Sequence, residues 1–189
     1  HVRSRRQRQM CIRDRDDEVK AAVLNLSGDV HGLVADAGVP EDLERIVATV
    51  VEARGRLDYL VLNAGLSEPS TILDETPEHF DRHFGVNVRG MVFGLKAALP
   101  ALARGSSVIL MGSIADGMGI PPYSTYAATK AAVRSYARSW ARELAPMGIR
   151  VNVVAPGPTD TAMMAAVPEE GRAAPVSYTH LTLPTTPYV

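Results

Sequence analysis

Residues 57–65 read LDYLVLNAG, a short and mostly apolar run that passes directly into an asparagine and two small residues. A run of this length has the size of a buried strand. It does not alternate cleanly between apolar and polar residues, which is typical of a strand whose sheet is covered by helices on both faces. The residues at its end mark the start of a turn.

Helical and strand-like segments alternate on both sides of this run. Pro40, with acidic residues just behind it, begins one stretch with apolar residues at helical spacing, and Gly55 ends it. The expected helices are 16–25, 40–55, 76–104 and 122–145, and the expected strands are 30–36, 57–62, 108–111 and 151–155. This alternation predicts an α/β fold with a doubly wound parallel sheet in a single domain.

Composition excludes several classes of protein. The chain has 189 residues and a formal net charge of −1, with no apolar run of membrane-spanning length. We therefore expect no membrane partner, no nucleic-acid partner and a cytoplasmic location. The single cysteine excludes a disulfide framework and a cysteine-based zinc site. No metal site is expected, and His31, His79 and His83 are interpreted as structural or solvent-exposed.

The two ends of the chain have an unusual relation to each other. Residues 10–14 (MCIRD) can be encoded by ATG TGT ATA AGA GAC, whose reverse complement encodes residues 176–180 (VSYTH). Complementary codons exist at every position of residues 1–15 and 175–189, and the match stops at Asp16 against Ala174. We expect these segments to be non-native tails translated from opposite strands of one DNA segment. The alternative for the first segment, which has six arginines, is a basic arm.

Small and polar residues follow three of the expected strands. They are Asn63-Ala64-Gly65, Gly112-Ser113 and Pro156-Gly157. The carboxyl ends of parallel strands lie at one edge of a sheet, where ligands of such folds bind. These residues therefore predict one ligand-binding crevice, although a Pro-Gly pair is also common in simple turns.

Tyr126 and Lys130 are four residues apart in an expected helix, which places both side chains on one face. An ammonium stabilises a phenolate, and a tyrosine helped in this way can exchange protons with a ligand. Ser113 can donate a hydrogen bond to a ligand oxygen. The alternatives are a partly exposed Tyr-Lys pair and a serine that only caps its turn.

The ordered set of Asn63-Ala64-Gly65, Asn87, Ser113, Tyr126, Lys130, Pro156-Gly157 and Thr161 closely resembles the single-domain subgroup of the short-chain dehydrogenase/reductase family. The resemblance covers nearly all of residues 16–174. It implies a Rossmann-like sheet and an NAD(P)-dependent oxidoreductase that interconverts a secondary alcohol and a ketone by hydride transfer. The substrate is then a small alcohol or carbonyl compound, and the intact parent is expected to be a homodimer or homotetramer.

The resemblance also implies a role for each of these residues. Tyr126 corresponds to the catalytic acid/base and is also one of the cofactor-binding residues. Lys130 corresponds to the lysine that assists it and binds the nicotinamide ribose, and Ser113 to the serine that orients the carbonyl. Asn87 corresponds to the asparagine that holds a water in the proton relay. The remaining cofactor-binding residues are Asp36 at the adenine, Asn63, Ala64 and Gly65 at the ribose, and Pro156, Gly157 and Thr161 at the nicotinamide. NAD and NADP are not distinguished.

Two departures from the family pattern shape the expectation for this chain. Residues 1–29 contain no glycine-rich turn of the kind that binds the pyrophosphate, and the pattern ends near Ala174. We therefore expect residues 16–174 to be a domain truncated at both ends, and the 189-residue chain to be an inactive fragment. Two other functions stay open: a non-catalytic binding or scaffold module with the same fold, and a sugar-nucleotide epimerase, which shares the Tyr-x3-Lys pattern.

Overall fold

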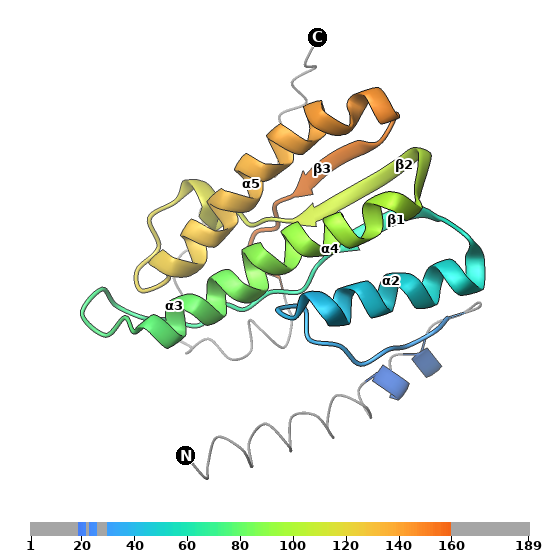
Figure 1. The fold of residues 1–189 in the computed structure, drawn as a ribbon. Helices are drawn as coiled ribbons and strands as arrows, with labels where there is room; N and C mark the ends of the chain where they lie inside the picture. Colours follow the sequence, from blue (N-terminus) through green and yellow to red (C-terminus); the bar gives the residue numbers. More distant parts are fainter. Residues whose placement is uncertain (1–18, 22, 26–29, 160–189) are drawn as a thin grey trace.

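A computed structural model describes residues 19–21, 23–25 and 30–159. Its sheet has three parallel strands in the order β1 (Leu57–Leu62), β2 (Leu102–Met111) and β3 (Arg150–Val154). The longer helices are α2 (Pro40–Arg54), α3 (Pro77–Phe84), α4 (Gly90–Ala98) and α5 (Ser124–Leu144). The expected parallel α/β fold is confirmed (Figure 1). The predicted tails 1–15 and 175–189 lie outside the described residues.

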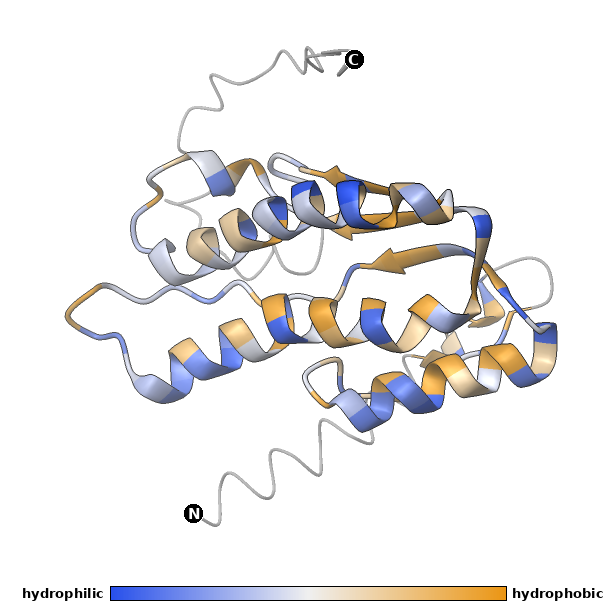
Figure 2. Ribbon diagram, turned by 45° about the horizontal axis from the view of Figure 1, so that its top comes forward, coloured by the Kyte–Doolittle hydropathy of each residue, from blue (hydrophilic) through white to orange (hydrophobic). Residues whose placement is uncertain are grey.

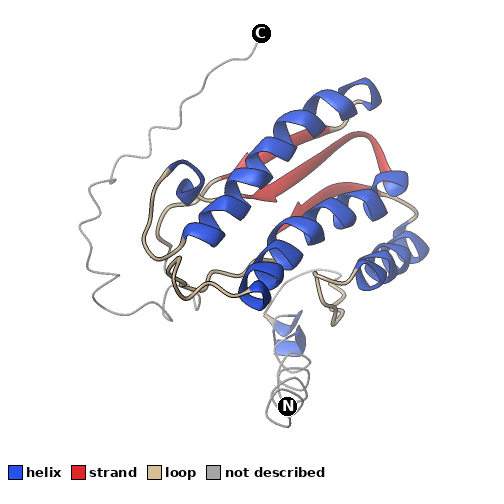
Figure 3. Ribbon diagram, turned by 60° about the vertical axis from the view of Figure 1, so that its left-hand side comes forward, coloured by secondary structure: helices blue, strands red, loops and turns tan. Residues whose placement is uncertain are grey.

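Helices α2, α4 and α5 all lie on the same face of the sheet (Figures 1 and 3). Beneath them, Val108, Leu110 and Val133 are buried in the main core together with Ile149. The strands are among the most hydrophobic parts of the ribbon (Figure 2). On the opposite face of β1, however, Tyr59 is 73% exposed and Val61 is 55% exposed. The expected helical cover on both faces is therefore present on only one face within the described residues.

The segment 30–36, which was expected to be a strand, is irregular in the structure. Its backbone pairs with side chains of α2 instead of with a neighbouring strand. Arg45 donates to the carbonyl oxygen of Val34 over 2.8 Å, and the N–H of Asp36 donates to Asp42 over 2.7 Å. A strand exists only with a partner backbone, and no such partner lies beside this segment among the described residues. The prediction of a strand was therefore wrong.

The long helix expected over 76–104 is divided into several parts. Thr76 caps α3 by accepting a hydrogen bond from the N–H of His79. A π-helical turn, η1 (Gly85–Arg89), then joins α3 to α4, and a 3₁₀ turn, η2 (Leu99–Ala101), ends the helical run. Strand β2 begins directly afterwards, six residues earlier than its expected start at Val108. The remaining short helices are the 3₁₀ turns η3 (Ile114–Gly117) and η4 (Ala145–Met147).

Two glycines let α4 approach its neighbours closely. A Cβ atom at Gly90 would collide with the carbonyl oxygen of Ala37, and one at Gly94 would lie 3.0 Å from a methyl group of Leu62. Helix α4 therefore packs against both the segment before α2 and the end of β1. No helix among the described residues is long and apolar enough to cross a membrane.

Candidate active site

The loops that follow the three strands meet at one edge of the sheet. The N–H of Gly112 donates to the carbonyl oxygen of Val154 over 2.7 Å, and the N–H of Ile114 donates to Pro156 over 3.1 Å. These bonds hold the residues after β2 beside those after β3. A Cβ atom at Gly157 would lie 3.6 Å from the side chain of Ile114, so the predicted Pro156-Gly157 turn belongs to the same edge.

Asn87 lies in the π-helical turn and is completely buried. Its side-chain oxygen accepts from the N–H of Leu66 over 2.7 Å, and its amide nitrogen donates to the carbonyl oxygen of Leu66 over 2.9 Å and to Thr129 over 3.0 Å. The side chain thus joins the loop after β1 to helix α5. A π-turn is common at functional sites because its extra residue changes the direction of nearby side chains.

Lys130 is buried at the centre of the site. Its Nζ atom donates to the carbonyl oxygen of Met111 over 2.8 Å and lies 5.7 Å from the centre of the Tyr126 ring. Burial lowers the pKa of the Lys130 ammonium to about 8, because removal from water disfavours the charged form. The expected i,i+4 pair on one helix face is therefore present, and its cation lies at the end of β2.

Gly65 brings the loop after β1 into contact with both residues. A Cβ atom at Gly65 would lie 3.4 Å from Oδ1 of Asn87 and 3.5 Å from Nζ of Lys130. Only a residue without a large side chain leaves this space open. The preceding residues, Asn63 and Ala64, are exposed, and they line a groove of about 310 Å³ that extends between α2, β1 and α4.

Ser113 is half-buried at the end of β2, and its hydroxyl oxygen accepts from the N–H of Ala115 over 3.2 Å. The serine therefore caps the short helix η3, as the simpler interpretation of the sequence proposed. A hydroxyl group can accept and donate at once, so this cap leaves its proton available for a ligand oxygen.

Two predicted cofactor residues differ from the others in position. Asp36 is exposed on the segment before α2, where its side chain accepts from the N–H of Gly38 over 2.8 Å and so stabilises a turn. Thr161 lies outside the described residues. The structure thus brings together residues from 63–65, 87, 112–113, 126–130 and 156–157, with Asp36 on a separate segment.

Thr129 also belongs to this arrangement, although it was not among the residues predicted from the sequence. Thr129 is completely buried, accepts from Asn87 and donates to the carbonyl oxygen of Tyr126 over 2.6 Å. A polar β-branched residue between Tyr126 and Lys130 was the available signal, because threonine is a weak helix former. It links the asparagine of the π-turn to the turn of α5 that carries Tyr126.

The parallel sheet and the buried polar groups at its carboxyl edge define a Rossmann-like α/β protein. The profile of the family described as Enoyl-(Acyl carrier protein) reductase matches residues 5–185. The chain belongs to the short-chain dehydrogenase/reductase family of oxidoreductases, which confirms the resemblance found in the sequence.

Individual relatives support this assignment. The chain is 38% identical over 155 residues to tetrahydroxynaphthalene reductase of Pyricularia oryzae. The aligned residues cover 82% of this chain and 55% of that reductase. It is 34% identical over 159 residues to the 3-oxoacyl-[acyl-carrier-protein] reductase FabG of Thermotoga maritima, covering 83% of this chain and 64% of that protein.

Solved structures agree with the fold. A short-chain dehydrogenase from Burkholderia cenocepacia in complex with NADP superposes with a TM-score of 0.71 at 37% identity, over 75% of this chain and 58% of that one. A dehydrogenase/reductase from Sinorhizobium meliloti gives a TM-score of 0.77 at 33% identity, over 85% and 64%. The chain spans 55–64% of the length of these four proteins.

Proposed function

We propose that the whole protein is an NAD(P)-dependent oxidoreductase that interconverts a secondary alcohol and a ketone, with Tyr126 as the acid/base. The observation that carries this proposal is the buried Lys130, held by Met111 at the strand edge with its ammonium 5.7 Å from the Tyr126 ring centre. A buried cation needs strong compensation, and its position beside a phenol suits the stabilisation of a phenolate.

The residues at the strand edge fit a dinucleotide. Gly65 leaves open space against Asn87 and Lys130, and the exposed Asn63 and Ala64 line the adjoining groove. The residues that would hold NAD or NADP are Asp36, Asn63, Ala64, Gly65, Tyr126, Lys130, Pro156, Gly157 and Thr161. When bound, the cofactor supplies or accepts the hydride. The NADP-bound relative from Burkholderia cenocepacia supports this choice of cofactor.

The chain's own residues would handle the proton. In reduction, the Tyr126 hydroxyl donates its proton to the substrate oxygen while Ser113 donates a hydrogen bond to the same oxygen. The Lys130 ammonium then stabilises the phenolate that remains. The family resemblance implies that Asn87 holds a water in the proton relay. Its hydrogen bonds with Leu66 and Thr129 fix the position of its side chain. In oxidation the same groups act in reverse.

The test uses the whole protein, a panel of small ketones and both reduced cofactors, with turnover followed by the loss of nicotinamide absorbance. Tyr126→Phe keeps the ring and removes the proton donor, so turnover should fall by about 10²–10⁴-fold with the fold intact. Tyr59→Phe on β1, whose side chain is 73% exposed and lies outside the site, is the matched control and should leave turnover unchanged. Near-normal turnover in Tyr126→Phe would contradict the mechanism.

The proposal includes self-association of the whole protein as a homodimer or homotetramer. On α5, Tyr136 is 39% exposed and stacks on Trp140 with ring centres 4.9 Å apart. Stacked aromatic side chains at a surface are typical of protein interfaces. Light scattering at micromolar concentration should give at least twice the monomer mass, and a monomer at this concentration would contradict the proposal.

A further inference from the structure

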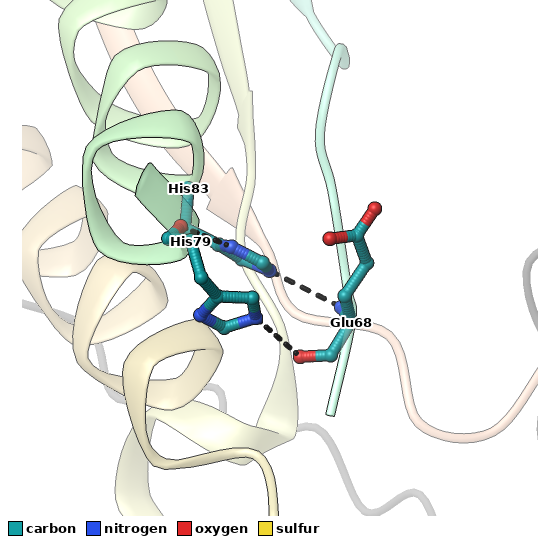
Figure 4. Close-up of side chains that lie close together, drawn as sticks. All are labelled: Glu68, His79 and His83. Carbon is teal, nitrogen blue, oxygen red and sulfur yellow. Dashed lines mark hydrogen bonds between the residues drawn. The ribbon is translucent and has the colours of Figure 1, made fainter. Parts of the chain in front are cut away.

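Two histidines on α3 bind the backbone N–H and C=O groups of one residue, Glu68, in the loop between β1 and α3, and this arrangement is called the grip. His79 and His83 are four residues apart, and their ring centres are 4.2 Å from each other. Nε2 of His83 lies 3.1 Å from the backbone nitrogen of Glu68, and Nε2 of His79 lies 3.3 Å from the backbone oxygen of the same residue (Figure 4). The N–H and the C=O of Glu68 each therefore face one imidazole ring.

The partners of His83 define its protonation state. The backbone N–H of Glu68 can only donate, so Nε2 of His83 must present a lone pair. The carbonyl oxygen of His79 lies 2.9 Å from Nδ1 of His83 and can only accept, so Nδ1 must hold the hydrogen. His83 is completely buried. It is thus a neutral imidazole with one defined tautomer.

The partners of His79 require the opposite state. Its Nδ1 atom lies 2.6 Å from a carboxylate oxygen of Glu75, and its Nε2 atom faces the carbonyl oxygen of Glu68. Both partners only accept when Glu75 is ionised. The hydrogen bond from the Thr125 hydroxyl is the largest effect that lowers the pKa of Glu75, and the bond from His79 adds to it. His79 therefore satisfies both partners as an imidazolium.

The loop between β1 and α3, which contains Glu68, forms one side of the proposed active site. Leu66, two residues before Glu68, forms hydrogen bonds with Asn87. Gly65, directly before Leu66, lies against Lys130. Two residues after Glu68, the N–H of Ser70 donates to the carbonyl oxygen of Pro122 over 2.8 Å, just ahead of α5. The second carboxylate oxygen of Glu75 accepts from Thr125 over 2.7 Å, next to Tyr126. Displacement of Glu68 would therefore move both the loop after β1 and the start of α5, which lie on two sides of the site.

We propose that His79 and His83 are positioning residues that hold the backbone of Glu68, with His79 charged and His83 neutral. A hydrogen on Nε2 of His83 would face the N–H of Glu68, and a lone pair on Nε2 of His79 would face the carbonyl oxygen of Glu68. Only this combination of donors and acceptors therefore satisfies both backbone groups. The effect on catalysis rests on the proposed function, whereas the grip itself does not.

The charged groups around the pair are consistent with this arrangement. Glu75 faces His79 directly, and Asp74 lines the same 340 Å³ cavity as His79. The Glu68 carboxylate pairs with Arg82 of α3, and from α5 the Thr125 hydroxyl faces Glu75.

A divalent cation is the competing explanation for this cluster. Ligand atoms of Glu68, His79 and His83 lie within 4.8 Å of one another. However, each Nε2 atom faces the Glu68 backbone and the Glu68 carboxylate is paired with Arg82. A cation would have to replace all three interactions, so the observed contacts favour hydrogen bonds from the two histidines to the Glu68 backbone over a metal site.

Imidazole ¹H–¹⁵N spectra of the 189-residue chain near neutral pH test the grip without any assay of activity. We expect two protonated nitrogens in His79, and in His83 a protonated Nδ1 with an unprotonated Nε2. A neutral His79, or a hydrogen on Nε2 of His83, would overturn the proposal. Zinc added at one equivalent should leave both rings unchanged, and zinc-dependent shifts of both at that ratio would establish the metal site instead.

Variants separate this positioning role from general stability. His83→Phe fills the space but removes both hydrogen bonds, so hydrogen exchange at the Glu68 amide should accelerate at least tenfold. His83→Gln supplies an acceptor and a donor in one side chain, and it should restore the protection of the Glu68 amide. Glu78→Gln on the exposed side of α3 is the control. Equal protection in wild type and His83→Phe would refute the grip, and His79→Gln provides a second folded variant if His83→Phe does not fold.

In the whole protein, His83→Phe should raise KM at least tenfold with a smaller change in kcat, and His83→Gln should restore KM. If the spectra show the expected protonation states while the whole protein oxidises and reduces nothing, the proposed function fails and the grip stands. If activity is present but KM does not respond to His83→Phe, the positioning role is wrong.

Discussion

The two faces of the sheet differ sharply in how well they are buried. Under α4 and α5, Val108 and Leu110 of β2 are completely buried. On the opposite face, Val61 of β1 and Val154 of β3 are 55% and 45% exposed. Neighbouring residues of one strand point to opposite faces, so the same three strands experience two environments. The buried polar groups of the site, Asn87, Thr129 and Lys130, all lie on the covered side of the sheet.

This difference shows which face of the sheet holds the polar groups of the site in fixed positions. Hydrogen bonds and charges have large effects only where water is excluded, and the covered face provides such a place. The exposed face contributes the strand ends but little packing. Substitutions of matched residues on the two faces therefore measure how much the packing against α4 and α5 contributes.

The largest effect is expected at Asn87. Asn87→Ala leaves the partly buried N–H and C=O of Leu66 without their partner. Each such group costs up to about 1–3 kcal/mol, so the free energy of unfolding should fall by about 2–6 kcal/mol. Asn152→Ala on the exposed side of β3 is the matched control, with an expected change within about 0.5 kcal/mol. Urea unfolding measures both. Equal losses would show that the two faces do not differ in solution.

A smaller effect concerns the buried charge of Lys130. Its pKa is about 8 in the folded protein and 10.5 in the reference state. Between these values the unfolded chain holds a proton that the folded chain lacks, so stability rises with pH, by up to about 3 kcal/mol relative to Lys130→Met. Unfolding at several values between pH 7 and 11 measures this rise. The exposed Lys96, replaced by Met, should show no comparable pH-dependent difference, and a parallel profile for Lys130→Met would contradict the burial of its charge.

The smallest effect is expected when one valine on each of two adjacent strands is replaced by threonine, which has nearly the same shape. Val108→Thr places a hydroxyl in the core and should cost about 1–3 kcal/mol. Val61→Thr makes the same change on the exposed face and should stay within about 0.5 kcal/mol. Thermal unfolding of the two variants measures the contrast. A cost at Val61 as large as that at Val108 would mean that another surface covers this face in solution.

Much of this architecture could be predicted from the sequence. The run at 57–62 is a strand with the expected bounds, and the strand at 150–154 is shifted by one residue from its expected position. These segments are apolar enough that local composition decides their structure. Tyr126 and Lys130 were likewise identified by helical spacing alone, because that spacing does not depend on distant parts of the chain.

Predictions that depended on distant partners were less successful. Residues 30–36 have the composition of a strand, but strand formation depends on a neighbouring backbone that composition does not supply. The π-turn around Asn87 was also missed, since the residues of 85–89 contain no signal as clear as a proline. The contacts of Asn87 with Leu66 and Thr129 span 21 and 42 positions in sequence, and no local pattern encodes them. His83 became interpretable only once Glu68 was placed beside it.

The π-turn also has a consequence for the phase of the helical run. It inserts one residue into the run, and one residue of an α-helix corresponds to a rotation of about 100°. The side chains of α3 therefore keep a different phase about the helix axis from those of α4. This offset lets His79 and His83 face the loop after β1 while Gly90 and Gly94 face the segment before α2 and the sheet. One inserted residue thus lets a single helical run serve two surfaces. In a regular α-helix of the same length, His83 and Gly90 are seven residues apart and would differ by only about 20° around the axis, so both would face the same side.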